Sequence, residues 1–187
     1  MRTLQRLGAL IVVAFALSAI GAANASAAQF TASATGFLSG KAVLIQIFTT
    51  NGNQVKCFTA ASSGTIKSVA SEEQTVEVKY SGCTAFGFVN THITTAFFNL
   101  TANGTVHIEN TITITPTGAG CTQTYPPQTR GLVMFYNSAN GYRADFHLSG
   151  LTYYSTGGLC GPSGNTGNFD GSTELQRVGG GYLTYDL

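Results

Sequence analysis

A period-two alternation of apolar and polar residues constrains the fold of this chain more than any other feature of its sequence. In residues 105–115, valine and isoleucine would point to one side of an extended strand, while His107, Glu109 and the threonines would point to the other. Residues 75–80 and 142–148 alternate in the same way. This pattern is typical of antiparallel strands with one buried face. After the N-terminal segment, no stretch predicts a helix.

Two further runs, residues 42–48 and 132–136, are apolar on both faces and predict central strands that are covered from both sides. Turn signals rich in glycine, asparagine and serine separate the strands. They occur at residues 51–53, 62–64, 103–104, 118–120, 140–141 and 157–158. Their spacing predicts an all-β, antiparallel β-sandwich of about ten strands, with a β-barrel as the alternative.

The first 27 residues have the three parts of an export signal. Arg2 and Arg6 precede an apolar run over residues 7–21, and small residues that fit a cleavage site follow it. The run has about 15 residues, fewer than the roughly 20 that a membrane-spanning helix needs. We therefore predict that residues 1–27 are a removed signal peptide. Residues 28–187 are expected to form a single secreted, extracellular β-domain without a membrane span.

The remaining chain is nearly neutral. Removal of Arg2 and Arg6 would leave seven Lys and Arg residues against eight Asp and Glu, a net charge of −1. The basic residues are scattered, so the sequence lacks the basic patch that nucleic-acid binding requires. The same scatter argues against attraction to anionic lipids. The partner classes left open are a cell-surface component and a carbohydrate.

The four cysteines, Cys57, Cys83, Cys121 and Cys160, predict two disulfides in an exported chain. A zinc site is the alternative, but no two cysteines form a CxxC pair. A weak internal repeat relates residues 30–100 to residues 101–187, although chance similarity among Thr- and Gly-rich strands would also explain it. If the repeat is real, each half closes its own bridge. The predicted pairs are then Cys57–Cys83 and Cys121–Cys160.

Candidate catalytic groups are few. His107 with Glu109, and Asp145 with His147, are spaced to share one strand face and could form part of a base-and-orienter arrangement. The solvent face of any antiparallel strand has the same appearance. The acidic cluster of Glu72, Glu73 and Glu77 follows a turn, where solvated charge is the default. We therefore predict no catalytic residue and no cofactor.

Two other sequence patterns resemble binding sites. Residues 165–171 resemble part of a calcium loop, but Thr166 and Arg177 stand where its first and last acidic ligands belong, so a surface turn is favoured and no metal site is predicted. Tyrosines are frequent in the second half, and such rings suit contact surfaces as well as a core or its rim. They are Tyr125, Tyr136, Tyr142, Tyr153 and Tyr154.

The segments TTNGNQVKC, KYSGCTAFGF, TANGTVHIENTITIT and STGGLCG resemble a group of small secreted proteins from high-GC Gram-positive bacteria. Members of that group share Thr-rich strands, four cysteines and a closing stretch that matches residues 180–186. The resemblance covers nearly all of the chain after the signal. It implies export and β-architecture, and it carries no established activity or functional residues.

The leading functional hypothesis is therefore a non-catalytic extracellular protein: a binding, adhesive or envelope-associated β-domain. It depends on the small number of ionisable residues beside a disulfide-bonded scaffold. A secreted hydrolase, with Asp145 and His147 as the first residues to test, is the alternative. A membrane-inserting β-protein, whose Thr-alternating strands would line a pore, is the second alternative.

Overall fold

The computed structural model describes residues 27–187, and these residues fold almost entirely into antiparallel β-strands. The all-β class and the antiparallel pairing predicted from the sequence are confirmed. The predicted signal peptide lies, except for its last residue, outside the described residues. Among the described residues, no helix has the length and apolar character needed to cross a membrane.

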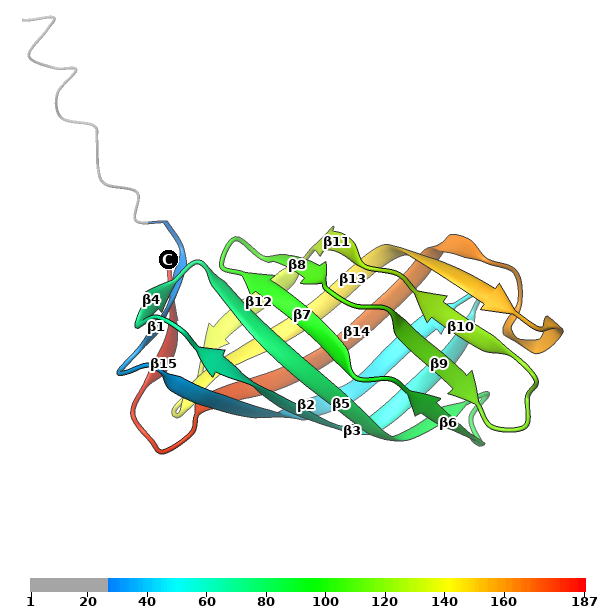
Figure 1. The fold of residues 1–187 in the computed structure, drawn as a ribbon, viewed down its shortest axis with the longest axis horizontal. Helices are drawn as coiled ribbons and strands as arrows, with labels where there is room; N and C mark the ends of the chain where they lie inside the picture. The colour runs from blue at the N-terminus through cyan, green and yellow to red at the C-terminus, as the bar shows by residue number, and fades with distance from the viewer. Residues whose placement is uncertain (1–26) are drawn as a thin grey trace, which may run out of the picture.

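The main sheet is a closed barrel with eight wall positions, in which each strand pairs with its neighbours in the sequence (Figure 1). Three of these positions are occupied in turn by two or three short strands that follow one another along the chain. In chain order, the wall consists of β2 (Gly36–Thr50), β3 (Asn53–Ile66), β5 (Glu73–Ala85), β6 and β7 (Val89–Ile93 and Ala96–Thr101), β8 and β9 (Thr105–Ile108 and Ile112–Pro116), β10, β11 and β12 (Thr122–Tyr125, Gln128–Gly131 and Val133–Asn137), β13 (Gly141–Thr156) and β14 (Gly164–Arg177).

Pairing of β14 with β2 closes the ring, from Asn168 opposite Thr49 to Arg177 opposite Leu38. This long-range pairing decides between the two architectures that the sequence allowed. A sandwich would leave β2 and β14 in different sheets or at free edges, whereas the barrel pairs the backbone groups of both. The structure is therefore the barrel, the alternative in the sequence-based prediction.

Side chains complete the wall where main-chain pairing is interrupted. Between β10 and β12 the chain separates from β13, and Gln128 bridges the gap by donating to the carbonyl of Thr152 (3.0 Å) and accepting from its N–H (2.9 Å). Arg130 donates to the carbonyl oxygen of Gly150 at 2.7 and 3.1 Å. Backbone groups that would otherwise lack partners are satisfied in this way.

Aromatic side chains fill the barrel interior. The ring of Phe169 lies 4.7 Å from Phe48, 5.7 Å from Phe146 and 6.1 Å from Phe98, measured between centroids. The predicted alternation is confirmed here: the aliphatic residues of the 105–115 segment are buried, and its threonines lie on the outer side. The core is thus a packed cluster contributed by every wall position.

A second, three-stranded sheet closes one end of the barrel, which we call the cap end. It consists of β1 (Gln29–Ala32), β4 (Ala70–Ser71) and β15 (Leu183–Asp186), so both ends of the described chain meet there (Figure 1). Phe30 of β1 stacks on Tyr142 with ring centroids 5.1 Å apart and meets Phe135 edge-on at 5.0 Å. The cap is therefore anchored by aromatic packing onto the core.

The prediction that residues 42–48 form a strand covered on both sides is wrong. From Lys41 to Gln46, β2 advances five positions, while β3 advances four, from Ala61 to Cys57. This β-bulge breaks the alternation, so Val43, Leu44 and Ile45 are all exposed on the outer wall. A single-layer barrel has no second sheet to cover them.

Three other local predictions need correction. Residues 132–136 are not covered on both sides, because Leu132, Met134 and Tyr136 are exposed on the outer wall. Residues 62–64 are not a turn but lie inside β3, where Gly64 approaches the carbonyl oxygen of Thr75 too closely for any side chain. Residues 165–171 are likewise strand, within β14, rather than a surface turn.

Both predicted disulfides are present. Cys57–Cys83 joins β3 to β5 at directly paired positions, and Cys121–Cys160 joins two loops. The chain up to Thr101 and the chain from Thr105 onward each supply four of the eight wall positions to one shared ring. The two bridges occupy different kinds of position, so the internal repeat stays a prediction.

Replacement of Phe169 by Ala should lower the free energy of unfolding by about 3 to 5 kcal/mol, because it removes the ring at the centre of the aromatic core. Phe37→Ala is the control, since Phe37 is exposed on the outer wall and its loss should cost less than about 0.5 kcal/mol. Urea unfolding with both disulfides intact measures the two. Equal losses would contradict the packed-core description.

Burial raises the pKa of the Tyr142 hydroxyl above the ordinary value of about 10. The protonated form is therefore favoured in the folded state, and its contribution to stability is present below pH ~10 and lost as the pH rises further. Above that pH, the free energy of unfolding should fall with pH more steeply in the wild type than in Tyr142→Phe. The difference in slope should be about 1.4 kcal/mol per pH unit. The hydroxyl has no hydrogen-bond partner in the described part of the chain, so neutral-pH stability should not fall. Urea midpoints at several alkaline pH values test this, and parallel curves would refute it.

Candidate functional site

Four connections meet at the end of the barrel opposite the cap, which we call the loop end. They are residues 51–52, 86–88, 117–121 and 157–163, and the last includes the short 3-10 helix η1 (Gly158–Cys160) (Figure 1). Because the barrel is an up-and-down ring, connections far apart in sequence are brought together at this end. Such loop clusters on rigid scaffolds are the usual place for binding residues.

The longest of these loops is held from several sides. Cys160 is bonded to Cys121, and its carbonyl oxygen accepts from the Gln123 amide at 3.2 Å. Asn51 donates to the carbonyl oxygen of Pro162 at 2.9 Å and accepts from the hydroxyl of Tyr153 at 2.8 Å. The loop is thus fixed in one arrangement before any ligand arrives, which lowers the entropic cost of binding.

Two of the turns at this end share a backbone geometry but differ in sequence. Asn51–Gly52 and Phe86–Gly87 both have positive φ at two successive residues, 49° and 78° in the first turn and 53° and 84° in the second. Asn-Gly is the favoured sequence for such a hairpin, whereas a bulky residue in this conformation is strained. Strain of this kind tends to gather at functional sites. Phe86 is partly buried and packs against the hydrophobic core, and this packing accounts for an aromatic residue at a position that the turn itself disfavours.

Phe86 lines an open apolar groove of about 280 Å³ at the loop end. Two neighbours project from it into solvent: Phe88 is 81% exposed and Leu159 is 64% exposed. The remaining lining residues are Val89, Thr117, Gly118 and Ala119. Exposed apolar side chains that surround an apolar groove mark an interaction surface better than scattered ones do.

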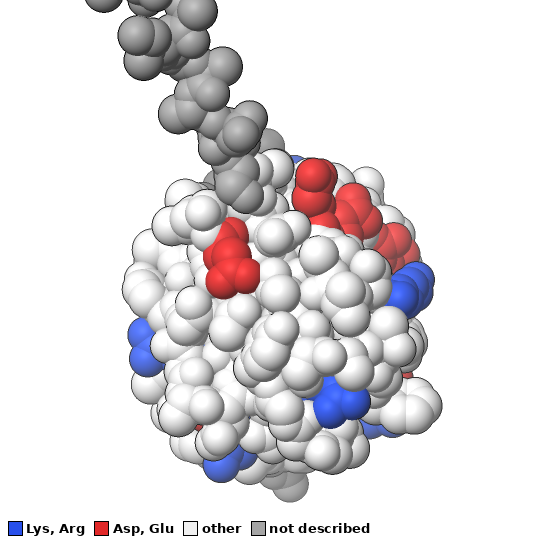
Figure 2. All heavy atoms as spheres, turned by 90° about the vertical axis from the view of Figure 1, so that its left-hand side faces the viewer, with Lys and Arg blue, Asp and Glu red and all other residues white. Residues whose placement is uncertain are grey.

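Charge is almost absent from this end. In residues 50–56, 83–92, 113–125 and 152–168, the only Lys, Arg, Asp or Glu is Lys56. The cap end is different, and Figure 2, which looks onto it, shows both acidic and basic side chains. The two ends of the barrel therefore differ in chemistry, with a neutral, partly apolar surface opposite a charged one.

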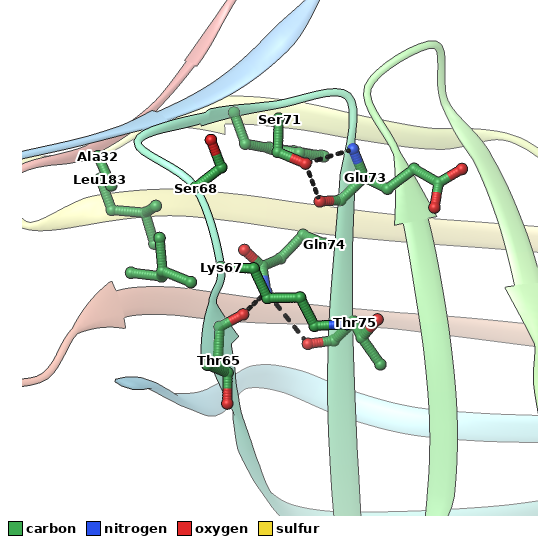
Figure 3. A pocket seen from close by; sticks show the side chains of 11 residues that line it. Ala32, Thr65, Lys67, Ser68, Ser71, Glu73, Gln74, Thr75 and Leu183 are labelled. Carbon is green, nitrogen blue, oxygen red and sulfur yellow. Dashed lines mark hydrogen bonds between the residues drawn. The ribbon is translucent and has the colours of Figure 1, made fainter. Parts of the chain in front are cut away.

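A second cavity, of about 140 Å³, lies between the cap sheet and the barrel wall (Figure 3). Its polar groups already hold the chain between β3 and β5. Gln74 donates to the carbonyl oxygens of Thr65 and Thr75, both at 3.1 Å, and Ser71 Oγ donates to the carbonyl of Glu73 and accepts from its N–H. Since these contacts account for the local structure, this cavity ranks below the loop end as a binding site.

A third feature is the wall patch, which consists of Val43, Leu44, Ile45 and Phe58. Leu44 is 63% exposed and Phe58 is 57% exposed, on the neighbouring strands β2 and β3. The bulge in β2 explains why these residues lie on the outside. Unlike the loop end, the patch lies on the side of the barrel wall, and Lys41 precedes it on β2.

The structure separates the residues considered for catalysis. Asp145 and His147 share the outer face of β13, but Asp145 binds Arg143 at 2.9 Å and Ser172 at 2.5 Å, whereas His147 lies 3.1 Å from Asp170. The two pairs are not joined by any hydrogen bond among the described residues. They lie on the convex outer wall of the barrel.

No hydrogen bond joins His107 to Glu109 among the described residues. His107 lies in β8 and bonds the hydroxyl of Thr129 at 2.8 Å, while Glu109 follows the end of β8 and is exposed. In the acidic cluster, Glu77 pairs with Lys79 at 3.0 Å and Glu73 accepts from Asn99 at 2.8 Å. In the described part of the chain, no three His, Cys, Asp or Glu residues are grouped as a metal site would require.

The tyrosines of the second half do not form one surface. Tyr125, Tyr142 and Tyr153 are buried in the core, and the exposed Tyr136 and Tyr154 lie on different strands, β12 and β13. Tyr142 packs toward the cap and Tyr153 toward the loop end. The core interpretation holds for three of the five, and no stacking platform results.

Comparison of the chain with family models, with curated proteins and with solved structures found no match. The site must therefore be judged on its geometry alone. Sequence reasoning missed Phe86, Phe88 and Leu159. Two signals could have found them: aromatic residues flanking the glycine of a turn, and long stretches of sequence without charge.

Gly157 and Gly158 provide a matched test of how the loop end is held. A side chain at Gly157 would collide with Gly120 and Cys121, and its φ of 82° disfavours other residues, whereas Gly158 has open space around it. Gly157→Ala should lower the free energy of unfolding by roughly 1 to 3 kcal/mol, and Gly158→Ala by less than about 0.5 kcal/mol. Urea unfolding of both variants is the measurement. An equal response would mean that the loop is not packed as described.

Proposed function

We propose that this chain is a secreted, non-catalytic binding protein in which the barrel is a rigid scaffold and the loop end is the contact surface. The observation that carries the proposal is the exposure of Phe88 and Leu159 beside an apolar groove, next to loops joined by Cys121–Cys160. A partner that buried these side chains would gain hydrophobic free energy, and the fixed loops would lose little entropy.

The choice of residue at the β5–β6 turn supports the same conclusion. Phe86 has a positive φ, a backbone conformation that asparagine adopts with less strain than phenylalanine. The turn at residues 51–52 has asparagine, Asn51, at the corresponding position. Its ring packs against the core on one side and lines the groove on the other, so it joins the contact surface to the barrel interior.

Secretion is part of the proposal. It is supported by the export-signal pattern of residues 1–27 and by the two disulfides, which persist in oxidising compartments. The adhesive or envelope-associated role expected from the sequence agrees with a scaffold that has one neutral, apolar end and one charged end. An adhesive partner would then bind at the loop end.

The test is NMR mapping of a simple amphiphile, octyl glucoside below its micelle concentration, on ¹⁵N-labelled protein. We expect the shift changes to gather at residues 86–89, 117–119 and 157–161. The double variant Phe88→Ser, Leu159→Ser should weaken binding by roughly tenfold, because it removes the two most exposed apolar side chains that line the groove. The fold should be unaffected, since both side chains are exposed.

Leu44→Ser, Phe58→Ser is the matched control, because it makes the same two substitutions at similarly exposed positions of the wall patch. This control should bind octyl glucoside as the wild type does. Shift changes confined to the wall patch, or to the cap-end cavity around Lys67 and Ser71, would overturn the assignment of the loop end.

A further inference from the structure

We infer that the loop end docks onto a lipid bilayer by inserting Phe88 and Leu159 into its interface, without a requirement for anionic lipid. The inference rests on the proposed function, because it uses the same contact surface, and it adds the chemical nature of the partner. The argument comes from charge, from backbone hydrogen bonding and from the placement of the two side chains.

The distribution of charge favours a lipid surface. The apolar interior of a bilayer excludes carboxylates, and the loop end, whose tips would reach toward it, has none: all eight Asp and Glu residues lie outside the stretches that form it. The one charged residue is Lys56, whose long side chain could keep its ammonium group at the headgroup level. With so little positive charge, attraction to anionic headgroups is not the driving force.

Some of the backbone N–H groups at the tips have partners within the protein. Phe88 N–H donates to the carbonyl of Ala85 at 3.1 Å, and Thr117 N–H donates to that of Asn90 at 2.8 Å. Gly161 N–H donates to Gly158 at 3.4 Å. Partial removal of these tips from water therefore leaves fewer polar groups unpaired, which is the condition that a lipid environment imposes.

Phe88 and Leu159 come from different loops and lie on the same groove. One follows the strained Phe86–Gly87 turn, and the other lies in η1 beside Cys160. Since the disulfide to Cys121 fixes η1, the side chains are presented together without prior ordering. Two rigid apolar tips at one end of a barrel are suited to penetrate an interface to a shallow depth.

A carbohydrate is less well matched to this surface. Sugar recognition combines an aromatic platform with convergent hydrogen-bonding groups, and the groove offers chiefly Phe, Val, Leu and Ala side chains with a single threonine hydroxyl. A second copy of the chain and another protein are the other possible occupants. Both are distinguished from lipid by the experiment below.

The experiment uses residues 28–187 with both disulfides formed, in flotation with phosphatidylcholine vesicles. We expect the protein to float with these vesicles, and binding to change little when phosphatidylglycerol is added or salt is raised. Phe88→Ser, Leu159→Ser should lower the partition coefficient by at least roughly tenfold. The wall-patch control Leu44→Ser, Phe58→Ser should bind as the wild type does.

A spectroscopic measurement reports insertion directly. The chain contains no tryptophan, so Phe88→Trp introduces a single tryptophan, excited apart from the tyrosines at long wavelength, at the loop end, and Phe58→Trp places one on the wall patch. Vesicles should shift the emission of the first variant to shorter wavelength and leave the second unchanged. A shift of the second alone would place the contact on the wall patch and overturn the inference.

Absence of flotation by the wild type would also overturn the inference. If octyl glucoside still maps to the loop end in that case, the proposed function stands and its partner is not a bilayer. If neither the amphiphile nor the vesicles bind at the loop end, both proposals fail. Concentration-dependent dimerisation that is lost in Phe88→Ser, Leu159→Ser, without vesicle binding, would assign the surface to a second copy of the chain.

Discussion

Pairing between β2 and β14 is the constraint on which the rest of the structure depends. Because the first and last wall strands bond to each other, the ring has no free edge, and each wall strand has one face toward a common interior. The interior must then be filled, and the cluster around Phe169, Phe146 and Phe98 fills it. The same closure leaves the outer wall without a second layer. Apolar residues on that side, such as Leu44, therefore face solvent.

Closure also gives the molecule two unlike ends. At the cap end, the terminal strands β1 and β15 pair with each other and anchor on Tyr142 through Phe30. At the loop end no sheet formed by residues 27–187 covers the barrel, and Cys121–Cys160 fixes the connections instead. The cap end carries charge of both signs, and the loop end carries almost none. We interpret this asymmetry as a division between a structural end and a contact end, with the disulfide serving the latter by limiting loop motion before a partner binds.

Much of the fold could be predicted from local patterns, and the errors have one physical origin. The alternation over residues 105–115 correctly predicted which side is buried, because a strand's side-chain period is fixed by its backbone. The apolar run at residues 42–48 was wrongly predicted to be covered on both sides, because a bulge in β2 places three successive side chains outward. Gly64 was wrongly predicted to lie in a turn. Glycine usually marks a turn, but here it permits close approach to Thr75 within a strand. Local composition cannot report such long-range contacts. The candidate site was missed for the same reason, since Phe88 and Leu159 are more than 70 positions apart in sequence.

The sequence by itself determined the secondary-structure class and the faces of the regular strands, because both depend on short-range periodicity. The cysteine pairs that the structure shows were predicted from the sequence only through the internal repeat, which stays a prediction. Only the tertiary structure decided between sandwich and barrel, because that choice depends on whether β14 pairs with β2, the last and the first strand of the wall along the chain. Only the tertiary structure also brought Phe86, Phe88 and Leu159 to one groove at an uncharged end. A surface formed by several loops cannot be recognised in any one segment of the sequence, because the loops come together only when the ring closes.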